Sequence, residues 1–190
     1  LAQSEAICQR MNGTFSRLTP EMGDKVRYLG FVHTFYSLVS PNKYFDKHPE
    51  YFALVGGKRR RHRAQLCLTN PEVLKIAIEA VRKRLRWARE HGWPENVIVS
   101  VSQNDCWGYC ECPNCRKLAE YEGSQAGPII HFVNKIAEAI EDEFPHAAID
   151  TLAYTYSRKP PRHVRPRHNV IVRLCSIECC FSHPLETCPV

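Results

Sequence analysis

The sequence lacks any apolar run close to the ~18 residues that a membrane-spanning helix needs. It also lacks the Gly-x-Gly-x-x-Gly and Gly-x-x-x-x-Gly-Lys loops that cradle phosphates, and the Gly-x-Ser-x-Gly turn that presents a serine nucleophile. No basic stretch leads into an apolar one at the start, so no secretory signal peptide is expected. Because the chain opens on Leu1 without an initiator methionine, we interpret it as a fragment or a trimmed product.

The composition is that of a folded domain: of 190 residues, 44% are hydrophobic and 24% are charged. This excludes an intrinsically disordered chain, and the length suits one domain over residues 1–190. The net charge of +6 is concentrated in two loops, 58–63 and 158–168, and on a helix around 82–89. Neither loop interleaves aromatic residues with its charges, so we expect solvated loops and no nucleic-acid partner.

Strands and amphipathic helices alternate along the chain. A capping box from Thr69 to Glu72, with Pro71 in the first turn, predicts a helix that continues to about Gly92. A second apolar stripe predicts a helix at 129–144. Short apolar runs predict a strand within 26–35 that ends near His33, and further strands at 97–102, 149–154 and 170–174. The segment 41–54 is predicted to be a long loop with short helical turns.

This order predicts an α/β fold with a parallel sheet. Four strands fit an open sheet or half of a (β/α)8 barrel of the TIM type. Because such a barrel needs roughly 250 residues, the chain would hold only part of one. We therefore expect a single, incomplete barrel-type domain.

Polar and aromatic side chains follow each predicted strand, at the edge where chemistry collects in parallel α/β folds. They are His33, Asn104, Asp105, Trp107, Tyr154, Tyr156, Glu178 and His183. Two carboxylates can divide the roles of proton donor and charge stabiliser, while aromatic rings and amides suit sugars. The set predicts a carbohydrate site. Turn or helix-cap chemistry is the structural alternative for Asn104 and Asp105.

Ten cysteines lie mostly in two groups, 106–115 and 175–188, while Cys8 and Cys67 stand apart. Cys112 and Cys115 have the knuckle spacing that lets two thiolates hold one zinc ion from a tight turn. Cys110 is close enough to join them, and the fourth ligand would be Cys106 or a residue from elsewhere. The alternatives are disulfides, which an exported protein favours, and buried free thiols.

Five stretches in consistent order resemble a bacterial family, the domain of unknown function 4838, whose members have been classed as glycoside hydrolase family 163. They are 33–35, His48 to Leu54, Gln65 to Pro71, Ser102-Gln103-Asn104-Asp105 with Cys110-x-Cys112-x-x-Cys115, and Cys175 to Pro184. The resemblance implies the catalytic domain of a (β/α)8 glycosidase that cleaves β-linked N-acetylglucosamine in complex N-glycans. It also implies export to the periplasm or cell surface, and no cofactor for the reaction.

The mechanism that the resemblance implies is substrate-assisted and retaining: the 2-acetamido oxygen of the sugar attacks the anomeric carbon and forms an oxazoline. It implies Asp105 as the partner of the acetamido group and Glu178 as the proton donor. Sugar contacts are implied for Tyr154 or Tyr156, Asn104 and Trp107. The alternatives are a non-catalytic carbohydrate-binding relative and a zinc-knuckle module that holds nucleic acid through the basic loops.

Overall fold

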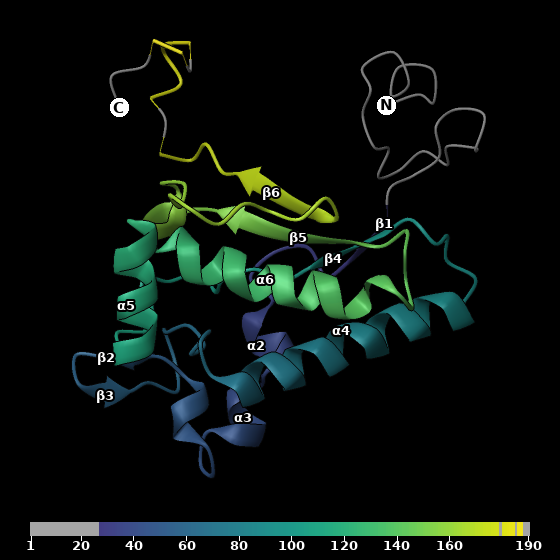
Figure 1. Cartoon of the computed structure of the whole chain (residues 1–190), viewed down its shortest axis with the longest axis horizontal. Helices are drawn as coiled ribbons and strands as arrows, with labels where there is room; N and C mark the ends of the chain where they lie inside the picture. Colours follow the sequence, from purple (N-terminus) through teal and green to yellow (C-terminus); the bar gives the residue numbers. More distant parts are fainter. Residues whose placement is uncertain (1–26, 179, 185, 188–190) are drawn as a thin grey trace.

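A four-stranded parallel sheet forms the centre of the computed structural model, which describes residues 27–178, 180–184 and 186–187. Its strands are β1 (Arg27–Leu29), β4 (Val97–Ser100), β5 (Ala148–Ala153) and β6 (Val170–Leu174). They lie in the order β1-β4-β5-β6, and each neighbouring pair is parallel (Figure 1). The predicted α/β class with a parallel sheet is confirmed.

Two long helices, α4 (Pro71–Glu90) and α6 (Ala126–Glu141), cover the same face of this sheet (Figure 1). Side chains alternate between the two faces along a strand, so every second residue of β4 and β5 points at the helices. The resulting core contains Val97, Val99 and Ile149 from the strands, packed with the apolar stripes of both helices. Both helices were predicted from their periodicity, and α6 begins slightly earlier than expected.

The first strand is shorter than predicted. β1 ends at Leu29, where the chain turns through Gly30 with a φ of 72°; Val26 lies outside the described residues. The amides of Thr34 and Phe35 then both donate to the carbonyl of Ser102, at 3.0 Å each, and helix α2 (Phe35–Leu38) begins. Phe35 is therefore buried in the core as part of a helix and not of a strand. Its aromatic side chain suits burial in either type of element.

Several small elements complete the fold. The expected helical turns in 41–54 are α3 (Pro41–Tyr44) and the 3-10 turn η2 (Pro49–Tyr51), and a further 3-10 turn η3 (Thr155–Ser157) follows β5. The hairpin of β2 (Leu54–Val55) and β3 (Lys58–Arg59) and the helix α5 (Pro113–Glu122) were not predicted. In Figure 1, α5 stands at the end where β5 and β6 finish, and α3 and the β2–β3 hairpin lie below α4. The buried residues of α5 are Cys115, Ala119 and Glu122, a mixed set that forms no apolar stripe.

The cap of α4 is Asn70, and the capping box predicted at Thr69 is wrong by one residue. Asn70 Oδ1 accepts from the backbone amides of Glu72 at 2.9 Å and Val73 at 3.4 Å. Thr69 Oγ1 instead lies 3.1 Å from Cys115 Sγ. Asparagine and threonine are both good caps, so the sequence alone did not separate them.

Replacing Asn70 with alanine is expected to lower the free energy of unfolding by about 1 kcal/mol, because two amides lose their acceptor. Urea unfolding followed by circular dichroism measures this change. Asn70→Ser restores an acceptor and should recover most of the loss. An Asn70→Ala protein as stable as the wild type would contradict the cap.

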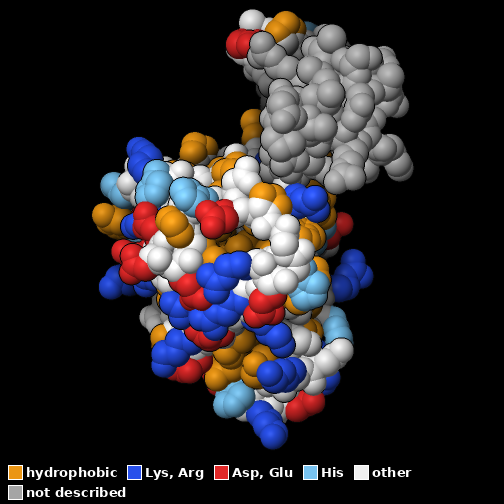
Figure 2. Space-filling model, turned by 90° about the vertical axis from the view of Figure 1, so that its right-hand side faces the viewer, with side chains coloured by type: hydrophobic (Ala, Val, Ile, Leu, Met, Phe, Trp, Pro, Cys, Tyr) orange, Lys and Arg blue, Asp and Glu red, His pale blue; other side chains and the backbone are white. Residues whose placement is uncertain are grey.

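The charges of α4 are paired across the surface. Arg82 lies 2.8 Å from Glu79, and Arg86 lies 2.7 Å from Glu143. Figure 2 shows basic and acidic side chains interspersed on the face at the carboxyl end of this helix. Interspersed charges do not form the continuous basic surface that attracts the phosphate backbone of a nucleic acid. Within the described part of the chain, no helix combines the length and apolarity needed to cross a membrane.

Candidate functional site

A cleft of about 640 Å³ opens at the carboxyl edge of the sheet. Three chain segments line it: the loop after β4 with Asp105 and Trp107, the turn after β5 with Tyr154 and Thr155, and the segment around the β2–β3 hairpin with Arg63. This is the edge at which parallel α/β proteins carry their ligand sites. The position expected from the sequence for the site is therefore occupied by a cleft.

Asp105 and Tyr154 join the ends of β4 and β5. Tyr154 Oη donates a 2.9 Å hydrogen bond to Asp105 Oδ1. This bond is the main cause that raises the pKa of Tyr154, and burial and the charges of Asp105 and Glu178 raise it further. The hydroxyl therefore keeps its proton at neutral pH and remains a donor.

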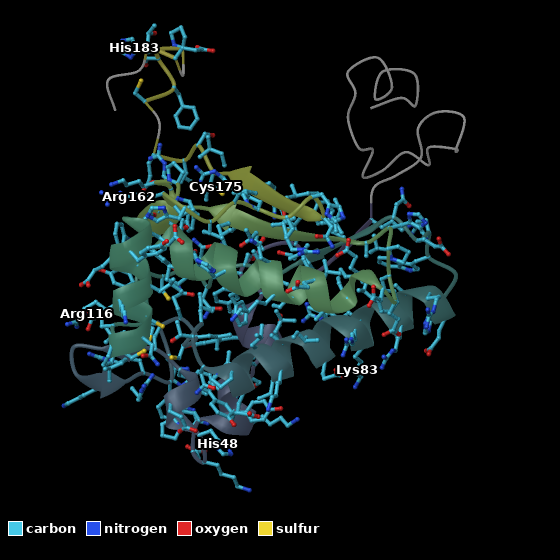
Figure 3. All side chains as sticks on the ribbon, viewed as in Figure 1. His48, Lys83, Arg116, Arg162, Cys175 and His183 are labelled. Atoms are coloured by element: carbon cyan, nitrogen blue, oxygen red, sulfur yellow. The ribbon has the colours of Figure 1, made fainter. Side chains whose placement is uncertain are left out.

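Glu178 and His183 belong to the chain after β6. Glu178 Oε2 accepts a 3.0 Å hydrogen bond from Arg158 Nη1, a partner that sequence analysis did not identify. His183 Nδ1 lies 3.0 Å from Cys180 Sγ, and Figure 3 shows His183 beyond the sheet and apart from Cys175 at the end of β6. Within residues 27–178, 180–184 and 186–187, no hydrogen bond, ion pair or ring contact joins His183 to Asp105.

Three of the four described non-glycine residues with a positive φ lie at or beside the cleft, and the fourth, Phe181, belongs to the chain after β6. His33, Arg63 and Thr155 have φ values of 55°, 52° and 48°, in the left-handed region that non-glycine residues rarely adopt. Arg63 and Thr155 line the cleft, and the ring of His33 lies 5.7 Å from that of Tyr154. Strain of this kind costs on the order of 1–3 kcal/mol per residue and persists mainly at functional sites.

His33 is fixed in its strained position by the loop after β4. Its Nδ1 donates to the carbonyl oxygen of Gln103 at 2.8 Å. Because that bond uses Nδ1, the other ring nitrogen, Nε2, is the one left for a ligand. The ring contact with Tyr154 places His33 near the end of β5, at the carboxyl edge of the sheet where it was expected.

The loop that carries Asp105 is held by Gln65, a buried amide that sequence analysis missed. Gln65 Nε2 donates to the carbonyls of Asn104 at 3.0 Å and Cys106 at 2.7 Å, and its Oε1 accepts from the amide of Asn104 at 2.8 Å. Asn104 Nδ2 donates to the carbonyl of Ala64 at 2.8 Å. The backbone amide and the side-chain amide of Asn104 thus both position the loop. Asn104 is not among the residues that line the cleft.

Trp107 presents an exposed aromatic face to the cleft, with 63% of the residue exposed. The ring of Tyr156 lies 6.2 Å from Trp107 and 5.3 Å from Tyr109. Burial raises the pKa of Tyr156, and Tyr156 does not line the cleft. Trp107 is therefore placed to stack on a flat ligand, while Tyr156 supports the aromatic group by packing.

Four cysteines cluster beside the cleft: the expected Cys110, Cys112 and Cys115, with Cys67, a residue from elsewhere in the chain, as the fourth. Cys67, Cys110, Cys112 and Cys115 are all buried, and their Sγ atoms lie within 4.8 Å of one another. Cys67 takes the place expected for Cys106, whose Sγ lies 3.4 Å from Gln65 Nε2. The sequence did not identify Cys67 because it lies far along the chain from the other three. Cys67, Cys110, Cys112 and Cys115 are free thiols, so the predicted disulfide alternative is not formed among these four.

The cluster has the arrangement of a metal-binding site. Soft thiolates close together are ligands for zinc and iron. The buried four-cysteine cluster is therefore able to bind a metal ion.

Comparison with known proteins gives one family. The family described as "Domain of unknown function (DUF4838)" matches residues 5–189, which include the sheet, the cleft and the cysteine cluster. No curated protein and no solved structure matches the chain. The match covers nearly the whole sequence, and the chain belongs to the DUF4838 family.

Proposed function

We propose that the protein is a glycoside hydrolase that cleaves β-linked N-acetylglucosamine in N-glycans or related glycans. The observation that carries this proposal is the 2.9 Å bond between Tyr154 and Asp105 in a cleft that also presents Trp107. A carboxylate and a phenol hydroxyl together match the N–H and the carbonyl oxygen of an acetamido group. An exposed indole supplies the flat surface on which a sugar ring stacks.

The proposed reaction uses the substrate's own acetamido group as nucleophile. Asp105 accepts a hydrogen bond from the acetamido N–H, and Tyr154 holds the acetamido oxygen toward the anomeric carbon. As that oxygen attacks, the glycosidic bond breaks and Glu178 gives its proton to the leaving oxygen. Water then loses a proton to Glu178 and opens the oxazoline at the anomeric carbon, which retains the β configuration.

The ion pair of Glu178 sets a condition on this reaction. Arg158 Nη1 lies 3.0 Å from Glu178 Oε2, so the guanidinium occupies the oxygen that would face the leaving group. In the proposed reaction, substrate binding therefore separates Arg158 from Glu178 and places the acid beside the glycosidic oxygen. The pair is partly exposed, so its separation costs no more than about 1 kcal/mol.

We also propose that the sheet is part of a (β/α)8 barrel. The strand order follows the chain order, and α4 and α6 cover one face, as in such barrels. A contact across the sheet also joins its outer strands: Arg173 of β6 lies 5.7 Å from the ring of Tyr28 on β1 and donates to the Phe31 carbonyl at 2.7 Å.

The substrate class implies where such an enzyme works. N-glycans are attached to secreted and cell-surface proteins, and an enzyme that degrades them meets them outside the cytoplasm. We therefore place the proposed activity in the periplasm or at the cell surface, with glycan as the partner. Fractionation of cells that express the full-length protein would test this placement.

The proposed function is tested with the full-length protein and a glycan that contains the chitobiose core. Proton NMR of the first product should show the β anomer, and a thiazoline analogue of N-acetylglucosamine should inhibit competitively, since it resembles the oxazoline. An α anomer formed first would exclude retention. Glycan binding without any hydrolysis would instead identify a carbohydrate-binding relative.

A further inference from the structure

The sulfur atoms of the cysteine cluster are spaced as metal ligands. Cys67 Sγ lies 3.6 Å from Cys112 Sγ and 3.9 Å from Cys115 Sγ, and all four sulfurs lie within 4.8 Å of one another. Four thiolates that hold zinc tetrahedrally at about 2.3 Å are about 3.8 Å apart. A disulfide would need two of them to approach to about 2.05 Å. The cluster therefore fits a tetrahedral metal ion with little movement.

The surroundings of the cluster offset the negative charge of bound thiolates. The backbone amide of Leu54 donates to Cys110 Sγ at 3.4 Å, and Arg59 Nη1 lies 3.9 Å from the same sulfur. Thr69 Oγ1 lies 3.1 Å from Cys115 Sγ. Cys112 is the N-cap of α5 and Cys115 lies in its first turn, where the helix dipole favours negative charge. These independent contacts converge on the sulfurs.

We propose that Cys67, Cys110, Cys112 and Cys115 bind one structural Zn²⁺ ion. Four protein thiolates fill all the tetrahedral positions, which is typical of structural zinc and leaves no position for substrate. Ala53, Ala64 and Val55 pack around the cluster and exclude water. On binding, the thiols that carry protons release them to solvent and the sulfurs become the ligands.

The zinc ion would fasten the loop after β4 to the hairpin segment. Gln65 precedes Cys67 in the same segment, and its backbone amide donates to the carbonyl of Gly108, in the loop after β4, at 2.8 Å. At Gly108 the two segments approach so closely that an added Cβ would lie 2.7 Å from the carbonyl oxygen of Arg63. The metal site thus holds both sides of the contact that positions Asp105 and Trp107. Its importance for catalysis, unlike the site itself, rests on the proposed function.

Metal analysis of matched serine variants tests the site. The full-length protein is expressed in zinc-supplemented medium, purified without chelators and analysed by inductively coupled plasma mass spectrometry. Wild type and Cys106→Ser should each hold about one zinc ion per chain, because Cys106 lies outside the cluster. Cys67→Ser should lose the ion. The same stoichiometry in all three proteins, or loss of zinc in Cys106→Ser alone, would overturn the assignment.

Cobalt substitution keeps the test decisive if Cys67→Ser does not fold. Cys67→His retains a zinc ligand, so this variant should still bind metal with three sulfurs and one nitrogen. With Co²⁺, wild type should show the intense visible bands of a tetrahedral tetrathiolate, and Cys67→His should shift them to shorter wavelength. Identical spectra, bound iron instead of zinc, or a disulfide found by thiol titration would each overturn the proposal. None of these readouts depends on glycan hydrolysis.

Discussion

Replacing Asp105 with asparagine is expected to lower kcat/KM for glycan hydrolysis by about 10³-fold, within the range known for groups that stabilise developing charge. Asparagine has the shape of aspartate and keeps an oxygen that accepts the 2.9 Å bond from Tyr154. The loop is held by Gln65 through the backbone, so its conformation should persist. What is lost is the negative charge that stabilises the acetamido group as it becomes positively charged. Steady-state kinetics of the full-length protein measure the effect.

Two further variants separate the roles in the cleft. Tyr154→Phe removes only the hydroxyl and should cost about 10- to 100-fold in kcat, less than the loss of the carboxylate. Glu178→Gln removes the proton donor. The loss of kcat should therefore be large for a natural sugar leaving group and small for an activated aryl leaving group that needs no proton. Asp46→Asn, a surface carboxylate 2.9 Å from Arg61, is the matched control and should hydrolyse glycan like the wild type. Near wild-type rates in both Asp105→Asn and Glu178→Gln would refute the proposed pair.

The parts of the fold that were predicted are those with a local pattern. α4, α6 and β6 follow from apolar periodicity, and β6 occupies the predicted residues. Asp105 and Tyr154 were predicted to lie at the same edge of the sheet because parallel strands place their carboxyl ends there, and the bond between them agrees with that reasoning. Periodicity and topology therefore predicted the frame and the location of the cleft.

The parts that were missed depend on contacts between distant segments. Cys67 joins the cysteine cluster across a long stretch of chain, and Gln65 holds the loop after β4 through bonds to its backbone. The role of Asn104 differs from expectation for the same reason, since the carbonyl of Ala64 occupies its side-chain amide. α5 was missed because its buried positions include a carboxylate, Glu122, where a periodic pattern would have an apolar residue.

Replacing the buried carboxylate of Glu122 is expected to have the second large effect, on the free energy of unfolding. Its Oε2 accepts from the amides of His163 at 2.8 Å and Val164 at 3.1 Å, and its Oε1 lies 2.8 Å from His131 Nε2. These bonds connect α5 and α6 with residues 158–168, the proline-rich segment that leads to β6. Glu122→Ala should lower the free energy of unfolding by about 3–5 kcal/mol, because buried donors lose their acceptor. Urea unfolding at neutral pH measures this loss.

The pH dependence of stability distinguishes the charge of Glu122 from its packing. Burial raises the pKa of this carboxyl, but the bonds from His163, His131 and Val164 outweigh burial and lower the pKa from 4.5 to about 2. Because the folded-state value is the lower one, the unfolded chain binds more protons between these values. Ionised Glu122 therefore contributes fully above about pH 4.5 and loses about 3 kcal/mol as the pH falls toward 2.

Glu122→Gln tests this contribution with little change in shape. Glutamine keeps an oxygen that accepts from His163 and Val164, so the loss at neutral pH should be smaller than in Glu122→Ala. It does not ionise, and its free energy of unfolding should therefore fall less steeply than that of the wild type between pH 4.5 and 2. Glu120→Gln, an exposed position on the same helix, should keep the wild-type slope. A Glu122→Gln curve parallel to the wild-type curve would show that the buried charge contributes nothing, and that packing alone holds α5 against the proline-rich segment.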